Sequence, residues 1–302
     1  MNRIALNGHV YTFIPSFENL TKNNGRLVPE LVGVRRASTF TGFCSTHDGG
    51  IFSPLETTPF VGTTEQLFLL GYRALSRELY TKESTASMTE VRRDTDKGRG
   101  IREQVAIQAF NSTFERGVSA GLRDARAEKA EYDVLLCSRQ FEEIRGYVIE
   151  TTEAPPVMCS GGCFPSIDFD GKRLQDLSNL KLRPAMISFS SFWGGAAGAI
   201  VLQWRAKDQT LCERFAASLH RIPDEGVGSA LGRLMFNCFE NVHIAPLWWE
   251  GLDARTQAAL VRKMTDTANP FVEQKDDALR DDGILLRGFT VANRYTVGFS
   301  FS

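Results

Sequence analysis

The stretch that decides the fold is Ile144-Arg145-Gly146-Tyr147-Val148-Ile149-Glu150-Thr151-Thr152, where the character of the chain changes. Its β-branched and aromatic residues favour a strand. The stretch ends before Pro155-Pro156, a pair that a central strand does not accommodate. Residues 167–174 follow, with Asp170-Gly171 between short flanks, and Asp-Gly is the strongest short-range signal of a β-hairpin. These segments predict the start of a sheet.

Two further strands are predicted downstream, over residues 185–192 and 199–205, joined across Gly194-Gly195. The final stretch, residues 296–301, alternates apolar and polar side chains as a half-exposed strand does. Strands joined by short turns pair antiparallel. The middle and C-terminal parts of the chain are therefore predicted to build an antiparallel sheet.

Helical periodicity dominates the chain before residue 144. Apolar residues spaced by three and then by four positions predict a long amphipathic helix that continues towards Phe141, with Ile107, Phe110, Phe114, Val118 and Leu122 on one face. Further helices are predicted near residues 211–219, 231–242 and 260–264. The order lacks the regular strand–helix alternation of a parallel sheet, so the predicted fold class is α+β.

Domain organisation is left open between two alternatives. The 302 residues fit one compact domain, 1–302. They also fit a mainly helical part, 1–143, followed by a mixed part of sheet and helices, 144–302. No linker-like tract separates the two parts, so the sequence does not decide between them.

Composition and charge exclude some classes of protein. A formal net charge of −1 gives the chain no overall attraction to DNA or to an anionic membrane. No apolar run is long enough to span a bilayer, and residues 1–9 lack the apolar core of a signal peptide. We therefore expect a cytoplasmic protein without a membrane partner, whose six cysteines are reduced thiols. Cys137, Cys212 and Cys238 are predicted to be core residues.

The main catalytic candidates lie in one aromatic and Gly/Pro-rich stretch, residues 40–56, which we expect to be a structured loop. They are Cys44, His47, Asp48 and Glu56. A thiol, an imidazole and a carboxylate can act as nucleophile, base and orienting group. Under this hypothesis the chain is a hydrolase-like enzyme. In the alternative, His47 and Asp48 make turn hydrogen bonds and Cys44 packs as a small apolar residue.

A zinc site is a third interpretation of the same stretch. Cys44 and His47 have the spacing of a zinc half-site, and Cys159 and Cys163, expected on a Gly-rich turn, would complete a Cys3His set. Such a site would tie the helical part of the chain to the sheet. It would make the chain a non-catalytic interaction protein with a zinc staple.

A second candidate region lies around the end of a predicted helix, which stops just before Pro246. Glu240, Asn241 and His243 are the alternative catalytic residues there. Trp248 and Trp249 come next, and they are interpreted either as a pocket wall or protein-partner surface, or as anchors of a helix on the core.

A weak basic patch precedes the long helix, and it consists of Arg92, Arg93, Lys97, Arg99 and Arg102. Basic residues and glycines near a helix start can bind phosphate. The interspersed acids reduce the local positive field, and a solvated helix face is the favoured interpretation. The patch gives no strong nucleic-acid signal.

Three scattered segments resemble a group of bacterial proteins of unknown function. They are Gly42-Phe43-Cys44 with His47-Asp48 and Glu56, then Tyr72-Arg73-Ala74-Leu75, and finally Glu240-Asn241 with Trp248-Trp249. The resemblance implies a bacterial intracellular protein and draws attention to Cys44, His47 and Asp48. A role in bacterial conflict or phage defence is a further hypothesis.

Overall fold

The computed structural model describes residues 1–14, 16–38, 40, 42–267, 272 and 275–301. Within these residues, one eight-stranded sheet has the order β2-β1-β7-β4-β5-β6-β3-β8, and every neighbouring pair is antiparallel. Its strands are β1 His9–Thr12, β2 Glu30–Gly33, β3 Ile144–Thr151, β4 Val157–Cys163, β5 Ile187–Trp193, β6 Gly198–Arg205, β7 Val242–Ile244 and β8 Val291–Val297. The predicted α+β class with an antiparallel sheet is confirmed.

The pairing of β3 with β6 forms the longest register in the sheet, from Ile144 opposite Arg205 to Thr151 opposite Gly198. The predicted connection between β5 and β6 is also present. Gly194 N donates to Ala197 O at 2.8 Å, and Gly195 takes a φ of +100°, a conformation that glycine adopts without steric cost.

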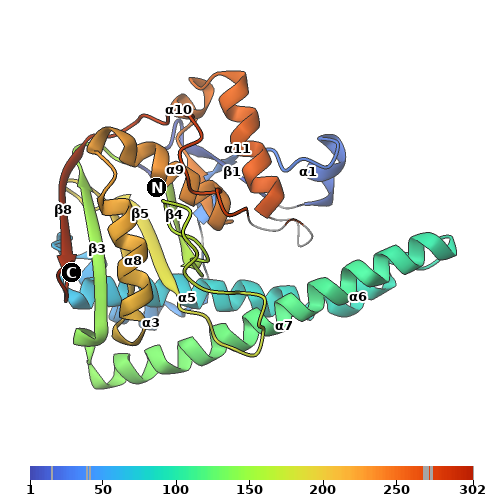
Figure 1. The fold of residues 1–302 in the computed structure, drawn as a ribbon, viewed down its shortest axis with the longest axis horizontal. Coiled ribbons are helices and arrows are strands. Elements are labelled where there is room, and N and C mark those ends of the chain that lie inside the picture. Colours follow the sequence, from blue (N-terminus) through green and yellow to red (C-terminus); the bar gives the residue numbers. More distant parts are fainter. Residues whose placement is uncertain (15, 39, 41, 268–271, 273–274, 302) are drawn as a thin grey trace.

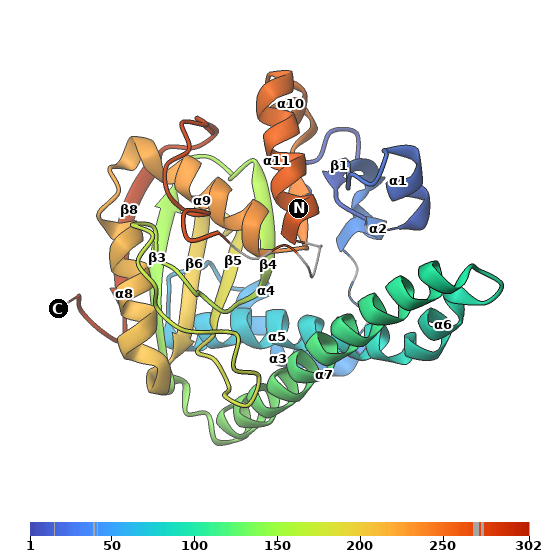
Figure 2. The same ribbon diagram turned by 45° about the vertical axis from the view of Figure 1, so that its right-hand side comes forward.

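Helices cover both faces of the sheet (Figures 1 and 2). Successive residues of a strand point to opposite faces. Accordingly, Tyr147 and Ile149 join the core beneath α8 and α9, whereas Val148 joins the core beneath α5 and α7. The helices are α1 Phe17–Lys22, α2 Val34–Ser38, α3 Ser45–Ile51, α4 Ser53–Glu56, α5 Thr64–Ser87, α6 Thr89–Arg93, α7 Ile101–Ser138, α8 Gln209–His220, α9 Asp224–Cys238, α10 Pro246–Glu250 and α11 Ala254–Thr267.

Helix α5 lies across the sheet and is positioned by two close approaches. It begins with a capping box between Thr63 and Gln66. A Cβ atom on Gly71 would come within 1.5 Å of the Gln203 side chain, and one on Gly146 within 2.2 Å of the Leu67 side chain. Glycine at these positions lets the helix and the strands pack in contact.

The long predicted helix is confirmed as α7. Together with the end of α5 and with α6 it forms a helical arm that projects from the sheet (Figure 1). The Arg93 guanidinium at the end of α6 binds the Glu115 carboxylate of α7 at 2.9 Å and joins the two sides of the arm. No helix in the described part of the chain is long and apolar enough to cross a membrane.

Two predicted strands differ from the structure. Asp170-Gly171 forms a turn, but its flanks meet only in an isolated bridge between Ile167 and Arg173. The Asp168 carboxylate accepts hydrogen bonds from the backbone N–H groups of Asp170 and Lys172, so the side chain satisfies groups that a longer ladder would otherwise pair. At the chain end, β8 stops at Val297, and residues 298–301 lie outside the described strands.

Candidate functional site

The stretch with the main catalytic candidates is helical, which corrects the predicted loop. Residues 45–51 form α3 and residues 53–56 form α4. Asp48 N donates to Cys44 O at 2.9 Å, and Phe52 N donates to Asp48 O at 3.1 Å. Phe52 is fully buried between the two helices and α5 and anchors them on the core. This tertiary anchor overrides the weak helix propensity of Gly49-Gly50.

Cys44 and His47 meet at the start of α3. The Cys44 Sγ lies 3.2 Å from His47 Nδ1, and both side chains are exposed to solvent. Residues three apart face each other on a helix, so the helical conformation itself brings the two groups together. A thiol in contact with a ring nitrogen can pass its proton to the imidazole. This pair is therefore able to supply a thiolate nucleophile.

Arg73 of α5 forms ion pairs with both carboxylates of the predicted site, Asp48 and Glu56. Its guanidinium lies 2.6 Å from Glu56 Oε1 and 3.6 Å from Asp48 Oδ1, and it stacks on Phe52 with 4.1 Å between the charge centre and the ring centroid. Among the described residues neither carboxylate contacts His47. The predicted orientation of the imidazole by Asp48 or Glu56 is not formed, because the Arg73 guanidinium binds both carboxylates.

Tyr72, next to Arg73, completes the contact of α5 with this stretch. Its ring stacks on Phe43 at a centroid distance of 6.2 Å, and its hydroxyl donates to Asp133 at 2.7 Å. The first two segments of the bacterial resemblance are therefore neighbours in space. Sequence reasoning did not assign Arg73 a role, since its partners lie 17 and 25 positions earlier in the chain.

Cys159 and Cys163 lie in strand β4, not on a turn as predicted. Both thiols are buried in the core beneath α9, and burial raises their pKa well above the ordinary value. Gly161 between them lets the Phe239 ring pack on the strand, since a Cβ there would lie 3.0 Å from that ring. Over the described ranges no three His, Cys, Asp or Glu side chains gather as metal ligands, so the predicted zinc set does not converge.

The other predicted core cysteines differ among themselves. Cys212 is buried as predicted, Cys238 is half-buried, and Cys137 is exposed on α7. Cys137 lies on the outer side of the helix, where the apolar pattern of the sequence does not coincide with the buried face.

The alternative catalytic residues surround strand β7. Helix α9 ends at Cys238, earlier than predicted, and Val242–Ile244 pairs with β1 and β4. His243 is 4% exposed, and its Nδ1 has no hydrogen-bond partner among the described residues. The pKa of His243 is lowered to about 4, mainly by burial and in smaller part by the nearby Arg77 and N-terminal amino group. The imidazole is therefore neutral near pH 7.

The neighbours of His243 in the predicted set make different contacts. Asn241 donates to the backbone oxygen of Ser160 at 3.3 Å, and Glu240 is exposed. Among the described residues neither of them contacts His243. Glu240 and Asn241 precede β7, which begins at Val242, and the Asn241 amide is bound by Ser160 of β4.

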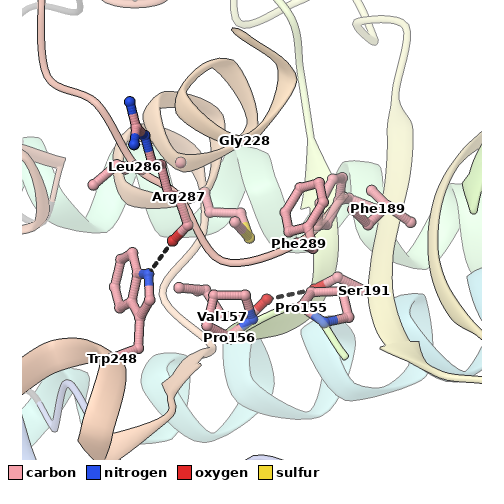
Figure 3. Close-up of a pocket in the computed structure, with 13 residues that line it drawn as sticks. Pro155, Pro156, Val157, Phe189, Ser191, Gly228, Trp248, Leu286, Arg287 and Phe289 are labelled. Atoms are coloured by element: carbon pink, nitrogen blue, oxygen red, sulfur yellow. Dashed lines mark hydrogen bonds between the residues drawn. The ribbon is translucent and has the colours of Figure 1, made fainter. Parts of the chain in front are cut away.

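The two tryptophans have different environments. Trp249 is buried and packs edge-on against Phe13, as expected of an anchor. Trp248 donates its indole N–H to Arg287 O and lines an apolar pocket with Phe189 and Phe289 (Figure 3). The pocket-wall interpretation therefore describes Trp248, and a protein partner at these residues stays a prediction.

The predicted basic patch lies on the helical arm, and acids of the same arm bind two of its members. Arg93 pairs with Glu115, and Lys97 pairs with Asp94 at 2.6 Å. Arg92 stacks over Phe114. These contacts agree with a solvated helix face.

The chain has no match among protein-family models, curated proteins or solved structures.

Proposed function

We propose that the chain is a thiol-dependent hydrolase in which Cys44 is the nucleophile and His47 is the proton acceptor. The observation that carries the proposal is the 3.2 Å contact between Cys44 Sγ and His47 Nδ1 at the surface. An exposed thiol adds little to packing and is open to oxidation. A reactive role explains why an exposed thiol and an imidazole are in contact, since packing does not require either of them there. The proposal requires a reduced thiol, as in the cytoplasm.

The pair supports acyl transfer to water in two balanced steps. His47 accepts the thiol proton as the sulfur adds to the carbonyl carbon of an ester, thioester or amide, and the imidazolium then protonates the leaving group as its bond to carbon breaks. In the second step His47 accepts a proton from water, which adds to the thioester carbon. The proton returns to the sulfur as the carbon–sulfur bond breaks, and the acid is released.

Thiol alkylation tests the first half of this chemistry without knowledge of the substrate. Cys137 is an internal control, because it is also exposed but contacts no histidine among the described residues. We expect iodoacetamide to label Cys44 about tenfold or more faster than Cys137 at pH 7, because a positioned base contributes to thiolate formation. Peptide mass spectrometry measures both rates in one sample.

The His47→Ala variant decides whether the imidazole is the cause. The rate at Cys44 should fall to that at Cys137, while the rate at Cys137 stays as in the wild type. Equal rates at the two cysteines of the wild-type protein would contradict the proposal.

A non-catalytic interaction protein is the second candidate, and a different observation favours it. Asp48 and Glu56 are both bound by Arg73, so part of the stretch has a structural role. If that role is the only one, Cys44→Ser and His47→Ala change neither thiol chemistry nor any hydrolytic rate. The alkylation experiment therefore separates the two candidates.

A further inference from the structure

A second pocket lies on α5 and is lined by other residues than the Cys44 site. Helices α5 and α7 run side by side below the sheet, and the segment between β4 and β5 folds over them (Figures 1 and 2). Arg123 of α7 donates to Leu180 O at 2.6 Å and holds this segment in place. The pocket leaves about 420 Å³ unfilled by protein atoms, part of it open to solvent. It is lined by Leu75, Glu78, Lys82, Asp124, Ala125, Glu128, Gly162, Phe164, Arg183, Pro184 and Met186.

Most of the charged groups at the rim are already bound to one another. The Glu128 carboxylate accepts a hydrogen bond from Lys207 at 3.1 Å, and the Arg183 guanidinium binds Glu131 at 2.6 Å. The Asp124 carboxylate is taken by its neighbour Arg123. These groups shape the rim and leave little capacity for a ligand.

Glu78 and Lys82 are different, because among the described residues each forms an ion pair only with the other. Lys82 Nζ lies 4.0 Å from Glu78 Oε2, beyond hydrogen-bond distance, and neither side chain makes a hydrogen bond to another described residue. Their side chains are 29% and 34% exposed, so a ligand entering the pocket can reach both. Burial raises the pKa of Glu78, and Glu240 raises it further while Lys82 and Arg77 lower it. The carboxylate therefore gains from an added positive partner.

Apolar side chains line the pocket beside this pair. Leu75 is buried, and Phe164 and Met186 are half-buried beside it. The Lys82 side chain lies against α7 beside Gly121. The pocket thus places a carboxylate and an ammonium side by side, next to a surface that accepts an aliphatic group.

We propose that this pocket binds a free α-amino acid with an apolar side chain. The ligand ammonium pairs with Glu78, the ligand carboxylate pairs with Lys82, and the side chain packs on Leu75, Phe164 and Met186. In an α-amino acid both charged groups are attached to the same carbon, which suits two protein charges that lie side by side. The proposal does not depend on the reactivity of Cys44.

Isothermal titration calorimetry with L-leucine tests the pocket in the wild-type protein. Isopentylamine lacks the carboxylate of leucine, and isocaproic acid lacks its ammonium. We expect L-leucine to bind, and each analogue to bind about tenfold or more weakly, because each loses one charge-assisted contact. These comparisons do not depend on the folding of any variant. Absence of leucine binding, or equal affinity for isopentylamine, would overturn the proposal.

Three variants assign the contacts. Glu78→Gln and Lys82→Met should each weaken leucine binding about tenfold or more, since each leaves one ligand charge unpaired. Glu83→Gln is the matched control, because Glu83 lies on the same helix but pairs with Arg126 outside the pocket. Unchanged binding in Glu78→Gln, or equal weakening in Glu83→Gln, would contradict the assignment.

Discussion

Two histidines, one followed by Asp48 and one three positions after Glu240, differ in exposure and in their contacts. His47 is exposed and touches a thiol, with Asp48 turned away to Arg73. His243 is enclosed between strands, and burial lowers its pKa to about 4. The comparison teaches that the residue types in a short stretch do not define a site. A site is defined by exposure to a substrate and by a reactive partner at contact distance.

The largest expected effect is a loss of hydrolytic activity when Cys44 or His47 is replaced. If the pair at α3 is catalytic, Cys44→Ser and His47→Ala should each lower the rate of p-nitrophenyl acetate hydrolysis about 10²–10⁴-fold. Both positions are exposed, so the free energy of unfolding should change by about 0.5 kcal/mol or less. Stopped-flow absorbance and urea unfolding measure the two quantities.

His243→Asn tests the other side of the comparison. The rate of p-nitrophenyl acetate hydrolysis by this variant should equal that of the wild type under conditions in which the variant is folded. The reason is that a neutral, enclosed imidazole has no access to a substrate. A loss of rate in the folded variant would mean that the buried histidine, and not the exposed one, belongs to the site.

The next effect is on acid stability. The pKa of His243 is about 4 in the folded protein and 6.5 when unperturbed. Between pH 6.5 and pH 4, His243 binds a proton in the unfolded chain but stays mostly unprotonated in the folded protein. The free energy of unfolding should therefore fall by roughly 3 kcal/mol between pH 6.5 and pH 4 because of this residue alone.

Variants isolate that contribution from the other titrating groups. Urea unfolding across this pH range should give a shallower dependence for His243→Asn than for the wild type. His9→Asn is the matched control, since His9 is exposed, and it should keep the wild-type slope. The same slope in both variants would show that His243 is protonated in the folded state.

The smallest effect concerns the clamp that holds α3, by which we mean the contacts of Arg73 with Asp48, Glu56 and Phe52. Arg73→Ala removes two half-exposed ion pairs and the stacking on Phe52, and we expect a loss of about 1–2 kcal/mol in the free energy of unfolding. Arg126→Ala, which removes an exposed pair with Glu83, should cost about 0.5 kcal/mol or less.

Alkylation of Cys44 in Arg73→Ala sharpens the result. The rate should fall towards that of Cys137, because α3 loses its attachment to α5 and the Cys44–His47 contact depends on the helical conformation of α3. An unchanged rate would show that α3 keeps its conformation without the clamp.

The central part of the sheet could be predicted from sequence because its signals are local. Residues 144–152, 185–192 and 199–205 show β-rich composition and lie between glycines or prolines, and the strands β3, β5 and β6 occupy nearly the same positions. Strand β4 could not be predicted. Gly161 and Gly162 are typical of a turn, but here they leave room for Phe239 and Met186. Those partners come from distant segments.

The candidate site was predictable only in part, for a similar reason. The Cys44–His47 contact follows from three-residue spacing once the segment is helical. The fate of Asp48 and Glu56 depends on Arg73, which reaches them only after α5 has packed on the sheet. Lys82 and Glu78 have the ordinary four-residue spacing of a surface ion pair, and only the packing of α7 turns them into a pocket wall.

The place of β1 in the sheet has a consequence for the order in which the chain can fold during synthesis. Strand β1 lies between β2 and β7, with Tyr11 opposite both Leu31 and Ile244. When the ribosome has made β1 and β2, the second neighbour of β1, strand β7, does not yet exist. Strand β4, which pairs with β7 on its other side, also waits with an open edge. The short strand β7, Val242–Ile244, therefore completes the sheet late. Until it emerges, the nascent chain exposes one unpaired edge on β1 and one on β4, and such edges are the kind that chaperones cover.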